Sequence, residues 1–309
     1  MSSWQLYALK KCDGWQGALR ETWDTEQLVG DVLSAEASGQ PDGTILRVVT
    51  PNGTTYATRV VSKGKACRPR FSDNSRRLLD DAAQTAWSED PASWWQSSMR
   101  GYEMFQVAGE AVVHAGAGSQ LHRDVVCATC CCVRAILGEK ENYFFGSTCL
   151  RDVLEMVDCW CKAQVLPFEV LKVWQPVGNT PERDWRSVRN AADRAVLAAM
   201  VQTGIGRVDD VRLSNEVWEA ARWAVAAVDA VVYLVCGELL DSDPTPQYVV
   251  VRCAEVAAAE ARGFAASMGL STYTVNSEAE RLRKETAMRC AEYIKYKVNV
   301  YDVLMYLIA

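Results

Sequence analysis

The sequence predicts an α+β protein that is predominantly α-helical, in which a small N-terminal antiparallel β-α-β-β module precedes an Ala-rich multi-helix domain. Residues 188–268 carry long Ala-rich runs, and Ala has the highest helix propensity and lets facing helices approach closely. The Asn52-Gly53 dipeptide lies between two β-branched runs, which is the strongest short-range signal for a β-hairpin. The 49% hydrophobic and 23% charged residues are typical of a folded globular chain and exclude a disordered one.

The N-terminal module is expected to span residues 1–62, with a strand at 4–11, a loop at 12–17, a helix at 22–37 and two hairpin strands at 44–50 and 54–61. The helix is indicated by Leu28, Val32 and Leu33, which lie at helical spacing. The result is a small antiparallel sheet with one helix.

Residues 63–77 are expected to be a linker, because Gly64 and Pro69 interrupt regular structure. Basic side chains outnumber the single Asp73 in this segment, which makes it a candidate anion or nucleic-acid patch. The alternative is a solvated connector whose charges pair with the acidic body of the protein. The patch residues are Lys63, Lys65, Arg68, Arg70, Arg76 and Arg77.

The helical domain is expected to span residues 78–309. Its helices are expected near 75–87, 91–115, 121–137, 148–164, 166–174, 188–203, 217–240, 248–268 and 278–307. Asp90 and Pro91 are the cap and first residue of one helix, and apolar side chains of 148–164 recur at spacings of three and four. Asp229 interrupts the most apolar run, so we expect no membrane span and place this side chain on a polar helix face.

The 12 cysteines are expected to be free thiols in a reducing, cytoplasmic protein, because several are adjacent and no signal peptide is visible. Cys127, Cys130 and Cys131 share one helix face, with further Cys and His residues nearby in the sequence. Buried structural thiols are the favoured interpretation. The sequence leaves open whether these three cysteines bind a metal, since zinc needs four ligands in a tetrahedral array.

The sequence contains no recognisable catalytic motif. Only two His are present, which limits general-base and nucleophilic mechanisms, and no carboxylates occur at a known catalytic spacing. We therefore assign no catalytic, cofactor-binding or metal residue and expect no cofactor. The enzyme question stays open, with a non-catalytic role favoured.

Residues 120–300 resemble the Ala- and Trp-rich helical, immunity-like proteins of bacterial toxin loci and phage genomes. The segments that carry the resemblance are HRDVVCATCCCVRAIL, CLRDVLEMVDCWC, AADRAVLAA, EAARWAVAAVDAVVY and ERLRKETAMRCAEYIKYKV. The resemblance implies a protein that neutralises a partner by contact and supplies no catalytic residue. It does not extend to the N-terminal module.

The function we expect is therefore non-catalytic protein–protein interaction, immunity-like or as a phage or conflict-system accessory factor. The alternative is structural self-assembly, as in a virion or shell, with copies meeting at the edge of the N-terminal hairpin. A nucleic-acid partner is not favoured, because the formal net charge is −6. Oligomer formation belongs to the assembly hypothesis.

Overall fold

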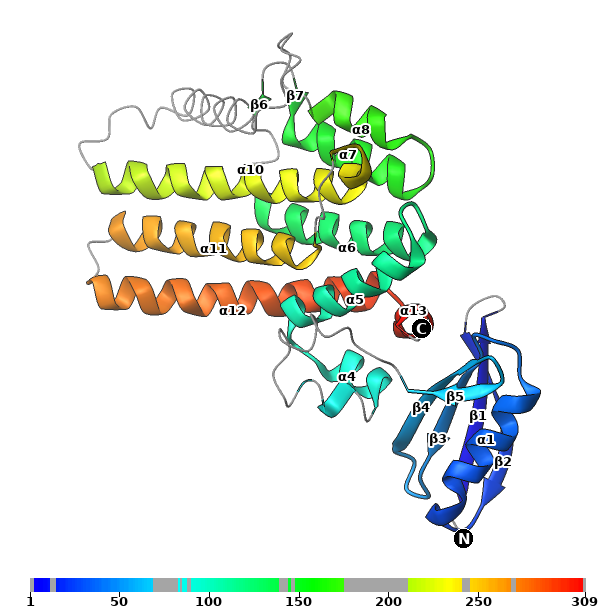
Figure 1. Ribbon diagram of the computed structural model, residues 1–309. Coiled ribbons are helices and arrows are strands. Elements are labelled where there is room, and N and C mark those ends of the chain that lie inside the picture. Colours follow the sequence, from blue (N-terminus) through cyan, green and yellow to red (C-terminus); the bar gives the residue numbers. More distant parts are fainter. Residues whose placement is uncertain are drawn as a thin grey trace. The chain divides into compact units, whose positions relative to one another are not determined.

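The computed structural model confirms an α+β protein that is predominantly α-helical, with an antiparallel sheet at the N-terminus (Figure 1). It describes residues 3–11, 15–68, 83, 85–87, 90–138, 144–145, 148–174, 211–240, 245–267 and 271–307. The helix expected at 188–203 lies outside these ranges. The chain divides into a sheet unit, Met1–Ser98 with Glu110–Gly116 and Val298–Ala309, and a helical unit, Met99–Gly109 with Ala117–Lys297.

The sheet unit contains five antiparallel strands in the order β2-β1-β3-β4-β5. Their bounds are β1 Trp4–Lys11, β2 Trp15–Trp23, β3 Ile45–Val49, β4 Thr55–Ser62 and β5 Lys65–Cys67. The predicted hairpin is confirmed, because β3 and β4 pair on either side of Asn52-Gly53 and Gly53 adopts φ +87°. Both of its strands are interior to the sheet, so strand addition between copies would occur along an outer strand, β2 or β5.

Helix α1 (Val29–Gly39), preceded by the short 3₁₀ helix η1 (Glu26–Leu28), covers one face of this sheet (Figure 1). Strand side chains alternate between faces, so every second residue of β1 and β3 points at the helix, as do Ala57 and Val61 of β4. The resulting core consists of Trp4, Leu6, Ala8, Trp23, Val29, Val32, Leu33, Ala37, Leu46, Val48, Ala57 and Val61.

Two short helices, α4 (Pro91–Ser97) and α13 (Val300–Tyr306), belong to the same unit. The α4 helix begins as predicted, with the Asp90 carboxylate accepting from the Ser93 amide at 3.2 Å and Pro91 at the first position. From α13, Tyr301 packs against Trp15 of β2 with ring centroids 5.7 Å apart. Asp302 forms an ion pair with Lys11 of β1, so α13 is tied to β1 and β2.

The N-terminal module differs from the prediction in two places. Residues 15–23 form strand β2 instead of continuing a loop, and the helix begins at Val29, later than residue 22. Most β2 side chains are exposed, so this edge strand lacks the apolar alternation that marks a half-buried strand. A further strand, β5, occupies part of the segment predicted as a linker.

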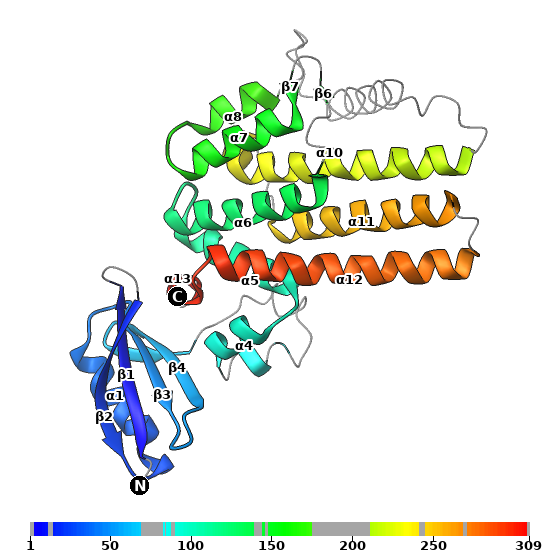
Figure 2. The same cartoon turned by 180° about the vertical axis from the view of Figure 1, so that it is seen from behind.

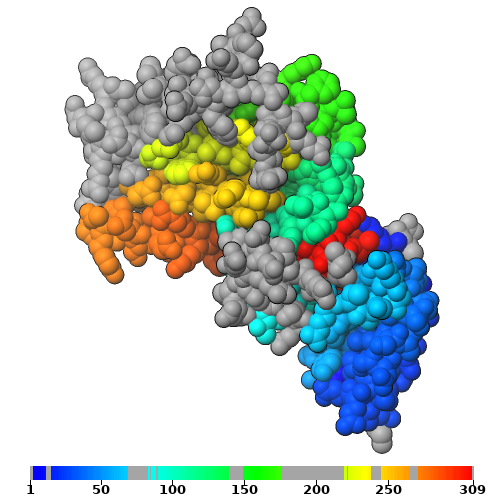
Figure 3. Space-filling view, in the orientation of Figure 1, coloured from blue at the N-terminus to red at the C-terminus, as the bar shows by residue number. Residues whose placement is uncertain are grey.

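The helical unit is built around three long antiparallel helices, α10 (Val211–Leu240), α11 (Gln247–Ser267) and α12 (Thr272–Lys297). They lie next to one another in one layer in both ribbon views (Figures 1 and 2) and form adjacent bands in the space-filling view (Figure 3). Their contacts are made by small side chains, such as Ala258 and Ala261 of α11 against Ala279 of α12. Ala-rich helices therefore pack closely here, as the sequence predicts.

The remaining helices of this unit pack around those three. They are α5 (Gly101–Ala115), α6 (Gln120–Leu137), α7 (Leu150–Cys161) and α8 (Pro167–Trp174). Residues 110–115 of α5 are grouped with the sheet unit. A two-stranded ladder of β6 (Phe144–Phe145) and β7 (Thr148–Cys149) precedes α7. α6 contacts α7, α10, α11 and α12. The buried His122 of α6 accepts from the Gly118 amide through Nδ1 at 2.9 Å, so Nε2 donates to the Leu234 carbonyl of α10 at 2.9 Å.

In the described part of the chain, no helix is long and apolar enough to cross a bilayer. Asp229 of α10 was expected on a polar face, and this is wrong: the side chain is only 6% exposed. Burial raises its pKa to about 7, against the opposing effects of a hydrogen bond from Trp174 and the charge of Arg252. Helical spacing alone does not distinguish a solvated face from one that a neighbouring helix covers.

Candidate anion-binding pocket

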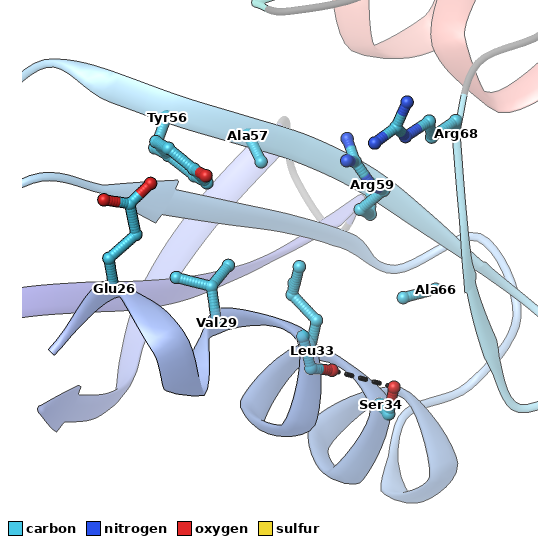
Figure 4. Close-up of a pocket in the computed structure, with 10 residues that line it drawn as sticks. Glu26, Val29, Leu33, Ser34, Tyr56, Ala57, Arg59, Ala66 and Arg68 are labelled. Atoms are coloured by element: carbon cyan, nitrogen blue, oxygen red, sulfur yellow. Dashed lines mark hydrogen bonds between the residues drawn. The ribbon is translucent and has the colours of Figure 1, made fainter.

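A pocket of about 430 Å³ lies in the sheet unit between α1 and the strands β4 and β5 (Figure 4). One wall is formed by η1 and α1, and the other by β4 with the end of β5. The lining residues are Glu26, Val29, Gly30, Leu33, Ser34, Tyr56, Ala57, Arg59, Ala66 and Arg68.

Two guanidinium groups lie at one end of the pocket. Arg59 extends from β4 and is half-buried, while Arg68 directly follows β5 and is exposed. Their guanidinium groups point toward each other in Figure 4. Burial lowers the pKa of Arg59, and the neighbouring positive charge of Arg68 lowers it further. An anion between the two groups would relieve this repulsion.

In the part of the chain that the structure describes, neither arginine is neutralised by an acidic side chain. Among the described residues, no carboxylate lies within ion-pair distance of Arg59 or Arg68. The one hydrogen bond described for Arg59 goes from Nη1 to the Thr58 carbonyl at 2.8 Å. Most of its five donors are thus free for an oxygen ligand, and guanidinium groups match carboxylate or phosphate with two parallel bonds.

The opposite end of the pocket is acidic. The Glu26 carboxylate lies beside the Tyr56 phenol and raises its pKa, by hydrogen bonding and by its negative charge. Tyr56 also packs edge-on against Trp4, with ring centroids 5.0 Å apart. The pocket is therefore polarised, with an occupied acid–phenol pair facing two uncompensated guanidinium groups.

A β-bulge places Tyr56 in this pocket. Val48 pairs with Ala57 but Val49 pairs with Thr55, so Tyr56 is an extra residue on β4. Strict alternation would send Tyr56 and Ala57 to opposite faces, and an inserted residue re-aims the side chain. Both therefore line the α1 side of the sheet. Arg20 occupies the matching extra position in β2, and its Nε donates to Glu36 of α1 at 2.8 Å.

The structure brings one residue of the predicted basic patch into the pocket, namely Arg68. Lys65 is exposed on β5, and Lys63 lies in the β4–β5 turn, where its amide donates to Asp42 at 2.7 Å. The other three patch residues, Arg70, Arg76 and Arg77, lie outside the described residues. Arg59 was not predicted. It lies between Ala57 and Val61 on the buried face of β4, and a charged side chain at such a position is a signal for a site.

The cysteines of α6 do not share one environment. Cys130 is buried with its thiol directed at the Leu154 carbonyl, 3.9 Å away, whereas Cys127 and Cys131 are half-buried. Within the described ranges, no three His, Cys, Asp or Glu side chains are arranged to hold a metal ion. All eleven described cysteines are free thiols.

Comparisons of this chain with protein-family models, with curated proteins and with solved structures found no match.

Proposed function

We propose that this chain is a non-catalytic protein-binding protein whose sheet unit holds an acidic group of its partner between Arg59 and Arg68. The observation that carries the proposal is the pair of neighbouring guanidinium groups in the pocket beside α1, with no carboxylate of the described residues in ion-pair distance. A carboxylate or phosphate group there forms charge-assisted bonds, which are about twice as strong as neutral ones.

The chemistry of the lining supports binding in preference to catalysis. Among the described lining residues, the only carboxylate, Glu26, is already hydrogen-bonded to Tyr56, and none is a His, Cys or Lys. A nucleophile with an adjacent base would be needed for acyl or group transfer.

A protein partner is favoured over a nucleic acid by charge. The net charge of −6 and Glu26 at the far end of the pocket repel an extended polyanion, whereas a single acidic side chain meets only the basic end. An immunity or conflict-system protein that acts by contact would use such a pocket to hold an acidic residue of the protein that it neutralises.

The test is a titration of the whole chain with N-acetyl-aspartate amide and, separately, with inorganic phosphate, followed by NMR of the arginine Nε–H signals. We expect saturable shifts at Arg59 and Arg68. Because a hydrogen bond to a charged group contributes roughly 1.5–3 kcal/mol, Arg59→Gln should weaken binding at least tenfold. Arg20→Gln is the matched control, since Arg20 lies in the same unit but is paired with Glu36; it should bind as the wild type does.

Two results would overturn the proposal. One is the absence of any shift at Arg59 and Arg68 with either probe. The other is tight binding of a single-stranded oligonucleotide with a steep salt dependence that Arg68→Ala flattens, which would make the pocket part of a nucleic-acid surface.

A further inference from the structure

Three half-buried thiols meet where α6 packs against α7. Cys127 and Cys131 lie one helical turn apart on α6, and Cys161 is the last residue of α7. Cys131 and Cys161 are the two groups that act most strongly on the Cys127 thiol, which is therefore the centre of the group. We call these three residues the half-buried thiol cluster.

Polar contacts on both sides of the cluster hold the two helices in register. Toward one end, Arg123 of α6 donates from Nη1 to the Trp160 carbonyl at 2.6 Å and lies over the Trp160 ring. Toward the other end, Arg134 of α6 forms a 2.5 Å ion pair with Asp158 of α7. The distance between Cys127 and Cys161 is thus set by contacts that do not involve the thiols.

The surroundings of the cluster favour a thiolate on Cys127. Hydrogen bonds from Cys131 and Cys161 hold the pKa of Cys127 below its ordinary value, and the positive charges of Lys297 and Arg134 act in the same direction. The pKa values of Cys131 and Cys161 are raised in turn, since hydrogen bonding to the Cys127 sulfur favours the protonated form of each. The thiolate is the nucleophilic form of cysteine, and the half-buried position leaves it within reach of a small molecule.

We propose that Cys127 is a hydroperoxide-reactive thiol and that Cys161 is its resolving partner, so that α6 and α7 are joined by a reversible disulfide under oxidising conditions. This inference concerns the helical unit and does not depend on the anion pocket.

Helix geometry selects Cys161 over Cys131 as the resolving residue. Cβ atoms at positions i and i+4 of a helix lie about 5–6 Å apart, whereas a disulfide needs about 3.5–4.5 Å. Joining Cys127 to Cys131 would therefore distort α6. Cys161 approaches from a different helix and ends it, and Ala163 just beyond adopts φ +58°, so the turn that follows α7 can adjust.

The reaction balances with a hydroperoxide as the oxidant. The Cys127 thiolate attacks the terminal oxygen, the O–O bond breaks, and the departing alkoxide takes a proton to become an alcohol, leaving a sulfenic acid on Cys127. The Cys161 sulfur, which loses its proton, then attacks the sulfenic sulfur and displaces hydroxide, which leaves as water with that proton. Two thiols lose two electrons in total, and the peroxide gains them. A low-molecular-weight thiol restores the reduced cluster by exchange.

The test uses the full-length reduced chain, treated with one equivalent of hydrogen peroxide, alkylated and digested without reductant for mass spectrometry. We expect a peptide pair linked through Cys127 and Cys161 as the first oxidised product, and its loss on dithiothreitol treatment. In Cys161→Ser, the sulfenic acid on Cys127 should persist and be trapped by dimedone.

Cys159→Ser is the matched control, because Cys159 lies on the same helix with a similar half-buried thiol but is not part of the cluster. It should form the Cys127–Cys161 link at the wild-type rate, whereas Cys127→Ser should form none. The proposal is overturned if the first oxidised residue is another cysteine such as Cys67, if the link joins Cys127 to Cys131, or if the reduced protein carries a stoichiometric metal in native mass spectrometry. All three outcomes are read on wild-type protein, so a misfolded variant does not obscure them.

Discussion

The helical unit contains a second three-thiol cluster, and the two clusters differ in whether solvent reaches their thiols. Cys132, Cys253 and Cys290 join α6, α11 and α12, and all three are at most 2% exposed. Cys132 and Cys253 act on the Cys290 thiol as Cys131 and Cys161 act on that of Cys127. We call this the buried thiol cluster.

Access and not hydrogen bonding distinguishes the two clusters. Hydrogen bonds from its neighbours hold the pKa of Cys290 below its ordinary value, as they do for Cys127, yet no oxidant can reach Cys290 without local unfolding. The adjacent residues Cys131 and Cys132 belong to different clusters, because consecutive helical residues point about 100° apart. A cluster of cysteines in the sequence is therefore not a single chemical site.

The largest effect is expected where α5 crosses α12 beside the buried thiol cluster. A Cβ at Gly101 would lie 2.3 Å from the Ala287 carbonyl oxygen and 3.2 Å from the Cys290 Cβ. Backbone cannot yield at such a distance without separating the helices, so Gly101→Ala should lower the free energy of unfolding by about 3 kcal/mol. Urea denaturation followed by circular dichroism measures this, and native alkylation of Cys290 should accelerate in parallel.

Gly39→Ala is the control for that substitution. Gly39 ends α1, adopts no positive φ, and its Cβ would meet nothing within 4 Å. The change should leave stability unaltered or raise it by about 0.5 kcal/mol, because Ala loses less backbone entropy than Gly. If Gly101→Ala lowered the free energy of unfolding no more than Gly39→Ala does, the α5–α12 crossing would tolerate the added methyl group.

Replacing one cysteine of each cluster by Ser should distinguish the two clusters through a smaller loss of unfolding free energy. Cys253→Ser places a hydroxyl, which is costlier to remove from water than a thiol, at a fully buried position and should cost about 2 kcal/mol of unfolding free energy. Cys127→Ser, at a half-buried position, should cost no more than about 0.5 kcal/mol. The comparison fails if the two denaturation midpoints fall by the same amount with unchanged slopes.

The sequence predicted the elements whose signals are local. Asn52-Gly53 specifies a hairpin through backbone conformation alone, and the apolar spacing of α7 puts Leu150, Val153, Leu154 and Val157 in the core, where the structure has them. Strand β2 was missed because an edge strand with solvated side chains carries no apolar alternation. Its pairing with β1 is a tertiary interaction.

Sites built from distant residues were only partly predictable. Arg68 was identified from the basic character of its segment, but that Arg59 lies beside it follows only from the way β4 and β5 pack beside α1. Likewise, Cys127 and Cys131 share a face by helical periodicity, whereas Cys161 joins them only through the packing of α7 on α6. Local periodicity gives the direction of a side chain, and tertiary packing decides what it meets.

Asp229 is a buried acid that lies outside both thiol clusters, and its substitution should give the smallest change in unfolding free energy. Burial raises its pKa to about 7 in the folded chain, against about 3.9 when unfolded. Between these values the folded state binds more protons, so the free energy of unfolding should fall as the pH rises from about 4 to about 7. Asp229→Asn should remove this dependence and stabilise the protein at pH 8.

The gain at pH 8 should be about 1 kcal/mol. The full ionisation penalty for a shift of this size is about 4 kcal/mol, since one pKa unit corresponds to about 1.4 kcal/mol. The Asn amide recovers only part of it, because its two N–H groups need acceptors where Oδ1 of Asp229 has no partner. Asp31→Asn, at an exposed position of α1, is the control for the substitution itself. Unfolding curves at pH 5 and pH 8 measure this effect. If Asp229→Asn lowers the free energy of unfolding equally at both pH values, the carboxylate stays ionised and Arg252 compensates its burial.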